Sequence, residues 1–190
     1  MLKELVLKNR TYRRFYQEEK VSKEELLELI DLARISSSAA NLQPLKYILS
    51  TENAKNEKVF SNIKWAGYLK DWNGPEEGEK PSAYIVMLSD SDISKNIFWD
   101  HGIAVQSILL GATEKGYGGC QFGAIDKVGL KRELEIPEKY EIVMVIALGK
   151  PKEVVVLEEL DKNRGIKYYR DEDGVHHVPK RKLEDLLLDI

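Results

Sequence analysis

An uncharged stretch near the middle of the chain constrains the fold more than any other feature. Between Gly102 and Thr113 no residue carries a formal charge. The apolar residues of this stretch lie most of the way round a helical wheel, and they are Ile103, Ala104, Val105, Ile108, Leu109, Leu110 and Ala112. A helix that is apolar on nearly all sides is normally buried. The sequence therefore predicts a central helix that the rest of the fold encloses.

The same stretch is too short to cross a membrane. A transmembrane helix needs about 20 consecutive apolar residues, whereas Asp100 and Glu114 flank this run. Its small residues, among them Gly102 and Gly111, allow other helices to approach closely, including the same helix of a second subunit. Glycines at 116, 118 and 119 then end the helix, and we expect the chain to re-enter the fold at 120–125.

Composition and charge exclude several classes of protein. The 190 residues are 43% hydrophobic and 32% charged, as in soluble globular domains, and the net charge of -3 argues against a general nucleic-acid binder. Cys120 is the only cysteine, so neither an internal disulfide framework nor a cysteine-based metal cage can form. The first residues lack the apolar run of a signal peptide. We expect a cytoplasmic protein with no membrane and no nucleic-acid partner.

The remaining pattern predicts further helices and strands. Ser22 and Glu25 form a capping box before an amphipathic helix, and the ranges 83–88 and 141–148 are apolar on both faces, as in central strands. We also expect a short first helix, helices at 53–63 and 127–134, strands at 46–50, 167–170 and 175–178, and a hairpin turn at 171–174. The pattern favours one α+β domain over residues 1–190, with a mixed or antiparallel sheet around the central helix. Its apolar C-terminal tail is expected to pack onto a partner subunit.

Two basic clusters lie near the ends of this acidic chain. The first contains Arg10, Arg13 and Arg14, and the second contains Lys180, Arg181 and Lys182. Together they could hold one dianionic phosphate, for which Arg offers a bidentate fork and Lys a point charge. They could equally be two solvated faces, which is the usual role of Lys and Arg. Charge alone favours the second interpretation.

Two loops rich in small residues are candidates for binding a planar ligand. They are SSSAANLQP at 36–44 and GYGGCQFG at 116–123. Small residues let backbone N–H groups approach a ring, and Asn41 and Gln43 can hydrogen-bond a heterocycle edge. Each loop is also compatible with an ordinary helix end. Neither matches the G-x-G-x-x-G or Walker pattern.

Other reactive or aromatic residues give weaker indications. His176 and His177 are neighbours in an expected strand, so their side chains point to opposite faces and do not share a metal. Cys120 has no evident partner base. Trp65 and Tyr68, with Trp72, are either core residues or the lining of a substrate pocket, and their Gly-rich, acidic surroundings favour the pocket.

Five motifs, in order and over nearly the whole chain, resemble those of the FMN-dependent nitroreductase family. NRTYRRF at 9–15 is similar to the family's R-R-S-x-R-x-F phosphate segment, and SSSAANLQP to its P-S-x-x-N-x-Q-P-W loop. Residues 100–126 look like its central helix, glycine turn and following strand. IALGKP at 146–151 and VPKRKL at 178–183 resemble its closing motifs. The resemblance implies a nitroreductase-like α+β fold and an intertwined homodimer.

The resemblance also implies roles for particular residues of this chain. The phosphate and ribityl chain of FMN would be held by Arg10, Thr11, Arg13, Lys180, Arg181 and Lys182. The flavin ring would lie along Ser37, Ser38 and Asn41 of the partner subunit, with backbone N–H groups of Phe122 and Gly123 near flavin N5. Asn9, Ser37 and Leu45 depart from the family's Arg, Pro and Trp. These departures bear on the phosphate grip, the rigidity of the loop and the packing of the pocket.

The implied activity is an oxidoreductase that uses FMN and either NADH or NADPH. Hydride would pass through flavin N5 to nitroaromatic, quinone or similar acceptors by ping-pong kinetics, with catalysis by the flavin rather than by a side chain. Reductive dehalogenation, flavin fragmentation and flavin binding without turnover are the alternatives.

Overall fold

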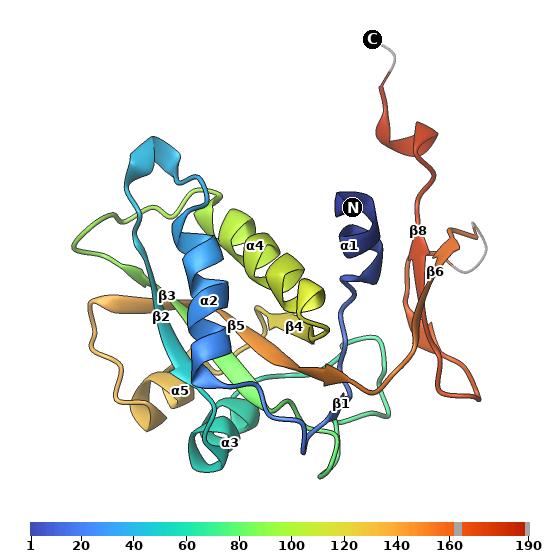
Figure 1. Cartoon of the computed structure of the whole chain (residues 1–190), viewed down its shortest axis with the longest axis horizontal. Coiled ribbons are helices and arrows are strands. Elements are labelled where there is room, and N and C mark those ends of the chain that lie inside the picture. The colour runs from blue at the N-terminus through green and yellow to red at the C-terminus, as the bar shows by residue number, and fades with distance from the viewer. Residues whose placement is uncertain (162–164, 189–190) are drawn as a thin grey trace.

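A five-stranded antiparallel sheet lies at the centre of the structure, a computed structural model that describes residues 1–161 and 165–188 (Figure 1). Four strands follow the order β1-β5-β3-β2, and β4 also pairs with β5. The strands are β1 (Phe15–Tyr16), β2 (Leu45–Ser50), β3 (Ala83–Asp90), β4 (Gly118–Phe122) and β5 (Tyr140–Pro151). The expected strands at 46–50, 83–88 and 141–148 are therefore confirmed, and the last two are longer than expected. The two-residue strand β1 was not expected.

Both faces of the two central strands are buried, because helices cover each side of the sheet. Ile85 and Met87 of β3 share one apolar cluster with α2 (Lys23–Arg34) and α4 (Asp100–Glu114). Tyr84 and Val86, which alternate with them, share a second cluster with α3 (Asn53–Ser61) and α5 (Lys127–Glu133). This arrangement confirms the helices predicted at 53–63 and 127–134, each ending slightly earlier. At the start of α2, the backbone N–H of Glu25 donates to Ser22 Oγ at 3.1 Å, as in the expected capping box.

The central helix α4 is buried against the sheet and α2, as predicted, whereas its own chain leaves one side open. Ala104, Ile108 and Ala112 are buried, whereas Ile103 is 37% exposed and Gln106 also faces outward. Gly111 does not lie on the open face, since a Cβ atom at this position would collide with Leu32 and Leu29 of α2. The close helix approach that the small residues permit is therefore, at Gly111, a contact within the chain.

A second, three-stranded sheet follows the main sheet. Its strands are β6 (Val155–Glu159), β7 (Tyr169–Arg170) and β8 (His176–Lys180), in the order β6-β8-β7, with β6 parallel and β7 antiparallel to β8. The turn between β7 and β8 confirms the hairpin expected at 171–174. The expected strand at 167–170 begins only at Tyr169, the one at 175–178 is displaced to His176–Lys180, and β6 was not expected.

The N-terminal helix and the C-terminal arm flank this small sheet. Helix α1 (Leu2–Lys8) lies between α4 and the small sheet (Figure 1). The arm, residues 181–188, projects beyond the small sheet, away from the rest of the chain. A 3-10 turn, η2 (Glu184–Leu186), lies within the arm. The apolar side chains of the arm are exposed, namely Leu183, Leu186, Leu187 and Leu188. The last two residues of the apolar tail, 189–190, lie outside the described residues.

Candidate functional site

A cavity of about 320 Å³ opens between the N-terminal segment, α4, β4 and β8. Residues of all four elements line it, and they are Asn9, Arg10, Thr11, Arg13, Gln106, Leu109, Gly119, Gln121, Tyr168, His176, Val178 and Lys180. Arg10, Thr11, Arg13 and Lys180 are four of the residues predicted to hold a phosphate. The structure thus brings one part of each basic cluster to the same cavity.

Backbone pairing fixes the N-terminal side of this basic cavity. Thr11 forms a parallel bridge with Gly119 of β4, and the Tyr12 N–H donates to the Gly119 carbonyl at 3.0 Å. A Cβ atom on Gly119 would lie 2.5 Å from Leu109 Cδ2 and 2.9 Å from the Ala147 carbonyl oxygen. Glycine is therefore required here for the close packing that holds Arg10 and Arg13 beside β4.

The alternation of strand β8 forms the opposite wall. His176, Val178 and Lys180 are two residues apart, so their side chains share one face of the strand. His177, on the other face, contacts Asp171 at 2.9 Å and Glu158 at 3.2 Å. The expectation that the two histidines point to opposite faces is confirmed.

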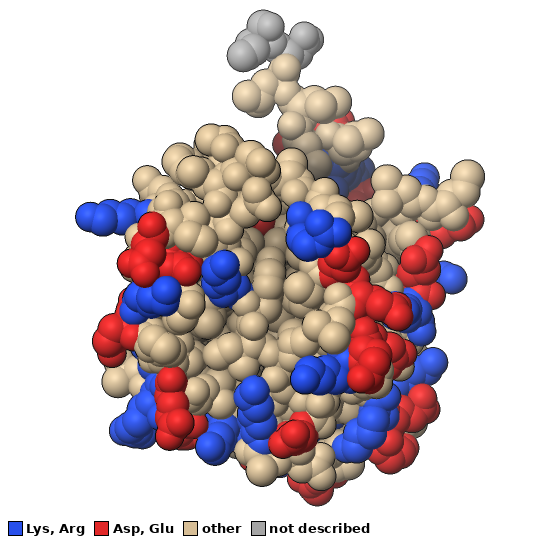
Figure 2. All heavy atoms as spheres, turned by 60° about the vertical axis from the view of Figure 1, so that its left-hand side comes forward, with Lys and Arg blue, Asp and Glu red and all other residues tan. Residues whose placement is uncertain are grey.

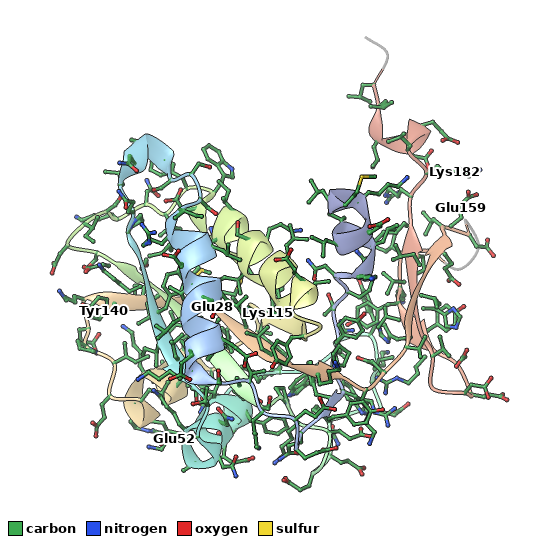
Figure 3. All side chains as sticks on the ribbon, in the orientation of Figure 1. Glu28, Glu52, Lys115, Tyr140, Glu159 and Lys182 are labelled. Carbon is green, nitrogen blue, oxygen red and sulfur yellow. The ribbon has the colours of Figure 1, made fainter. Side chains whose placement is uncertain are left out.

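The other basic residues of the two clusters have different surroundings. Arg14 forms a bidentate ion pair with Glu79 at 2.5 and 2.6 Å, and these hydrogen bonds lower the pKa of Glu79 to about 2. Lys182 points to Glu159 of β6 and pairs with it at 3.0 Å (Figure 3). Arg181 is exposed, and neither Arg181 nor Lys182 lines the basic cavity. Their assignment to the cofactor stays a prediction.

The basic cavity suits an anion. Three cationic side chains line it, and among the described residues that line it there is no carboxylate. Arg10 donates from Nη2 to the Val6 carbonyl at 2.6 Å, but its Nε is buried and has no hydrogen-bond partner among the described residues. A phosphate group supplies the acceptors that such a set of donors lacks.

The serine loop, residues 36–44, lines a separate cavity of about 300 Å³ beside the first turns of α4. Ser37 and Ser38 belong to its lining, as does Asp100, the first residue of α4. Ser38 Oγ donates to Asp100 at 2.5 Å, and the Ala39 N–H donates to the same carboxylate at 2.9 Å. Asn41 follows in an exposed turn with a φ of 55°. Within one chain, the structure does not bring these three predicted residues to the basic cavity.

The residues predicted near the flavin ring and the substrate lie around the end of β4. Phe122 is buried and packs against Trp65 in a T-shaped arrangement, with ring centroids 4.7 Å apart. Gly123 is exposed and has open space where a Cβ would lie. Trp65 is partly buried in the apolar cluster around Phe122. Tyr68 is 47% exposed and packs on Tyr168, with ring centroids 4.9 Å apart. The pocket role of Trp65 and Tyr68 stays a prediction.

Cys120 and four residues without a predicted role in binding complete the surroundings of the basic cavity. Burial raises the pKa of the Cys120 thiol to about 12, so the thiol is protonated near neutral pH and is not an activated nucleophile. Gln106, Gln121, Tyr168 and His176 line the basic cavity without having been predicted to do so. His176, Val178 and Lys180 alternate along one strand and so share a face. The predicted phosphate role of Lys180 could therefore have identified His176.

Comparisons with known proteins agree with this fold. A model of the nitroreductase family matches residues 6–150. YodC of Bacillus subtilis (strain 168), provisionally named as an NAD(P)H nitroreductase, is 27% identical over 162 residues, covering 68% of this chain and 79% of its own. A nitroreductase family protein from Clostridium novyi NT has a TM-score of 0.66 at 26% identity, covering 80% of this chain and 87% of that chain. The chain therefore belongs to the nitroreductase family and is an enzyme of that family.

A further solved structure is similar in fold alone. A provisionally named nitroreductase from Exiguobacterium sibiricum 255-15, solved in complex with FMN, has a TM-score of 0.70 at 18% identity and covers 86% of this chain and 95% of that chain.

In the described part of the chain, no helix combines the length and apolarity that crossing a membrane requires.

Proposed function

We propose that this nitroreductase family member is a homodimeric FMN-dependent oxidoreductase. It takes hydride from NADH or NADPH and reduces nitroaromatic, quinone or similar electrophilic acceptors. The observation that carries this proposal is the basic cavity, where Arg10, Arg13 and Lys180 meet without a lining carboxylate in the described chain. The family membership and the FMN bound to a protein of the same fold support the choice of cofactor.

The cavity residues fit the phosphate end of FMN. Arg10 and Arg13 offer charged N–H donors, Lys180 adds a point charge, and the Thr11 side chain is a hydroxyl that can donate or accept. The buried, unpaired Nε of Arg10 is a donor in need of an acceptor. Arg14 is already held by Glu79 in an ion pair and does not line the cavity, so it is not part of this set.

Protein groups in this site bind and orient rather than perform acid-base or nucleophilic chemistry. FMN, when bound, supplies reversible hydride and electron transfer. The open space at Gly123 leaves room for a planar ring to approach the backbone, whose N–H groups can stabilise negative charge on it. The thiol of Cys120, buried in β4, stays protonated and takes no part in the chemistry.

The dimer is proposed because one chain leaves the site incomplete. The serine loop and the basic cavity border different parts of α4 and form separate cavities, so a serine loop that contacts the same flavin must come from the partner. The chain also exposes large apolar side chains beside the loop and on the arm, including Trp99 at 75% and Leu188 at 82%. Figure 2 shows a broad area without charged residues on one face, with the arm projecting above it. Exposed apolar areas of this kind mark interaction sites.

The proposal is tested first by the absorption spectrum of the purified protein. An oxidised-flavin spectrum, with FMN released on heating at one per subunit, supports the cofactor. Anaerobic stopped-flow mixing with NADH or NADPH should then bleach the flavin, and a quinone or nitroaromatic should restore it. A protein that takes up no FMN refutes the proposal, and a bound flavin that neither nicotinamide bleaches indicates binding without turnover.

A further inference from the structure

Arg13 is surrounded by groups from the part of the chain that follows the family match. That match ends at residue 150. The Arg13 backbone N–H donates to the Glu153 carboxylate, and Arg13 Nη1 lies 3.1 Å from His176 Nε2. The Arg13 guanidinium carbon lies 4.6 Å from the centroid of the Tyr168 ring. Three residues of the C-terminal segment therefore fix both the backbone and the side chain of Arg13.

The carboxylate in this group binds the backbone of Arg13 and not its guanidinium. The Glu153 side chain is fully buried, and its second oxygen accepts from Arg170 Nη2 at 3.0 Å. A buried carboxylate needs such partners, because its desolvation is costly. Glu153 thus anchors the Arg13 main chain while its charge is balanced by Arg170.

The guanidinium of Arg13 has only neutral partners among the described residues. These are the His176 imidazole, the Tyr168 ring and the Thr11 carbonyl at 3.4 Å. His176 is 1% exposed, and its burial, together with Arg13, Arg170 and His177, lowers its pKa to about 4. Neutral imidazole can accept a hydrogen bond at Nε2 from Arg13 and removes none of its positive charge.

Arg14 shows the opposite arrangement one residue along the chain. Glu79 holds its guanidinium in a bidentate ion pair, and Lys152 joins the same carboxylate at 3.0 Å. An arginine whose guanidinium is already held by a carboxylate through two charge-assisted hydrogen bonds is less available to a second anion. Arg13 therefore has a guanidinium free of carboxylate partners among the described residues, whereas the guanidinium of Arg14 is bound to one.

We infer that Glu153, Tyr168 and His176 are positioning residues that orient Arg13 and keep its charge uncompensated for a phosphate monoester in the basic cavity. This inference rests on the proposed FMN function, of which it specifies the phosphate end. It assigns selectivity for the phosphorylated flavin to residues 153–176, beyond the part of the chain that the family model matches. None of the three needs to take part in hydride transfer.

The test compares His176→Gln with His176→Glu in the full-length protein stripped of flavin. Glutamine can accept from Arg13 as the imidazole does, whereas glutamate has the same shape and adds a charge against the guanidinium. The dissociation constants of FMN and riboflavin are measured by flavin fluorescence, because only FMN has the phosphate. Val128→Glu, on the exposed surface of α5, adds the same charge elsewhere and serves as the control.

The two variants should separate on FMN alone. His176→Glu should weaken FMN binding about tenfold or more, as expected for loss of a charge-assisted contact, and leave riboflavin binding within about threefold. His176→Gln and Val128→Glu should keep the wild-type ratio of the two constants. Inorganic phosphate should compete with FMN in the wild type and lose this effect in His176→Glu.

Several results would overturn the inference, and they differ from failure of the proposed function. If His176→Glu keeps the wild-type preference for FMN, or if both flavins weaken equally in both variants, His176 is structural only. If the wild type itself does not prefer FMN to riboflavin, the phosphate site fails and the inference fails with it. Should His176→Glu not fold, Tyr168→Leu against Tyr168→Phe applies the same test. Only the leucine variant, which lacks the ring over Arg13, should then lose FMN preference.

Discussion

The main sheet and the small C-terminal sheet are held together by different interactions. In β3, all residues but Ser89 are buried, and the apolar clusters on its two faces carry the packing. In β8, only His176 is fully buried, and the small sheet relies on contacts such as Glu153 with Arg170 and His177 with Asp171. The comparison teaches that apolar burial sets the fold, whereas a polar network after residue 150 sets the electrostatics of the cavity.

The largest effect should come from making the same substitution in both sheets. Val86 of β3 is 0% exposed, whereas Val156 of β6 is half-buried. Val86→Ala should lower the free energy of unfolding by about 2–3 kcal/mol, and Val156→Ala by less than about 1 kcal/mol, because lost burial and cavity formation scale with packing. Urea denaturation at one protein concentration measures both. Equal losses would mean that the small sheet is packed as tightly as the main one.

The next effect concerns the cations of the basic cavity. Arg13→Ala and Lys180→Ala should each weaken FMN binding by about 2 kcal/mol, as for hydrogen bonds to a charged group. Fluorescence titration measures the affinity, and Lys127→Ala on the distant helix α5 is the matched control. If neither cavity variant changes the affinity, these residues do not hold the phosphate.

A smaller effect, for each pH unit, is expected in the pH dependence of stability. Burial lowers the pKa of His176 from 6.5 to about 4, so between these values the unfolded chain takes up a proton that the folded chain excludes. This contribution is complete above pH 6.5 and is lost as the pH falls toward 4. His176→Gln should remove this loss, which is about 1.4 kcal/mol for each pH unit within that window.

The wild type and the variant must be compared directly, since a neighbouring histidine acts in the opposite sense. Hydrogen bonding to Asp171 raises the pKa of His177, so its contribution is present at low pH and is lost as the pH rises. Thermal denaturation from pH 4 to 7 gives the difference between the two proteins. Parallel curves would show that His176 titrates alike in both states.

The smallest effect should come from Lys182. Its ion pair with Glu159 is solvent-exposed, so Lys182→Ala should leave both stability and FMN affinity close to those of the wild type. The same titration and denaturation measure it. A loss of FMN affinity as large as that for Lys180→Ala would return Lys182 to the cofactor site.

The sequence predicted the parts of the molecule whose pattern is local. Apolar runs gave β3 and β5, and Ser22 with Glu25 gave the start of α2. The surroundings of Arg13 could not be found in this way, because Glu153 and His176 lie 140 and 163 residues away along the chain. The half-buried strand β6, VVLEE, also lacks an alternation of apolar and polar residues. The family motif already selected Arg13 rather than Arg14, but the groups that hold each arginine are seen only in the fold.

The position of the cavity walls in the chain has a consequence for how the protein is made. The last strand of the main sheet ends at Pro151, but the basic cavity also needs residues up to Lys180. During synthesis the chain emerges from its N-terminus, and contacts between distant residues form late. The sheet can thus assemble before the phosphate site exists. We expect cofactor loading to follow the emergence of β8, which brings His176 and Lys180 to Arg13.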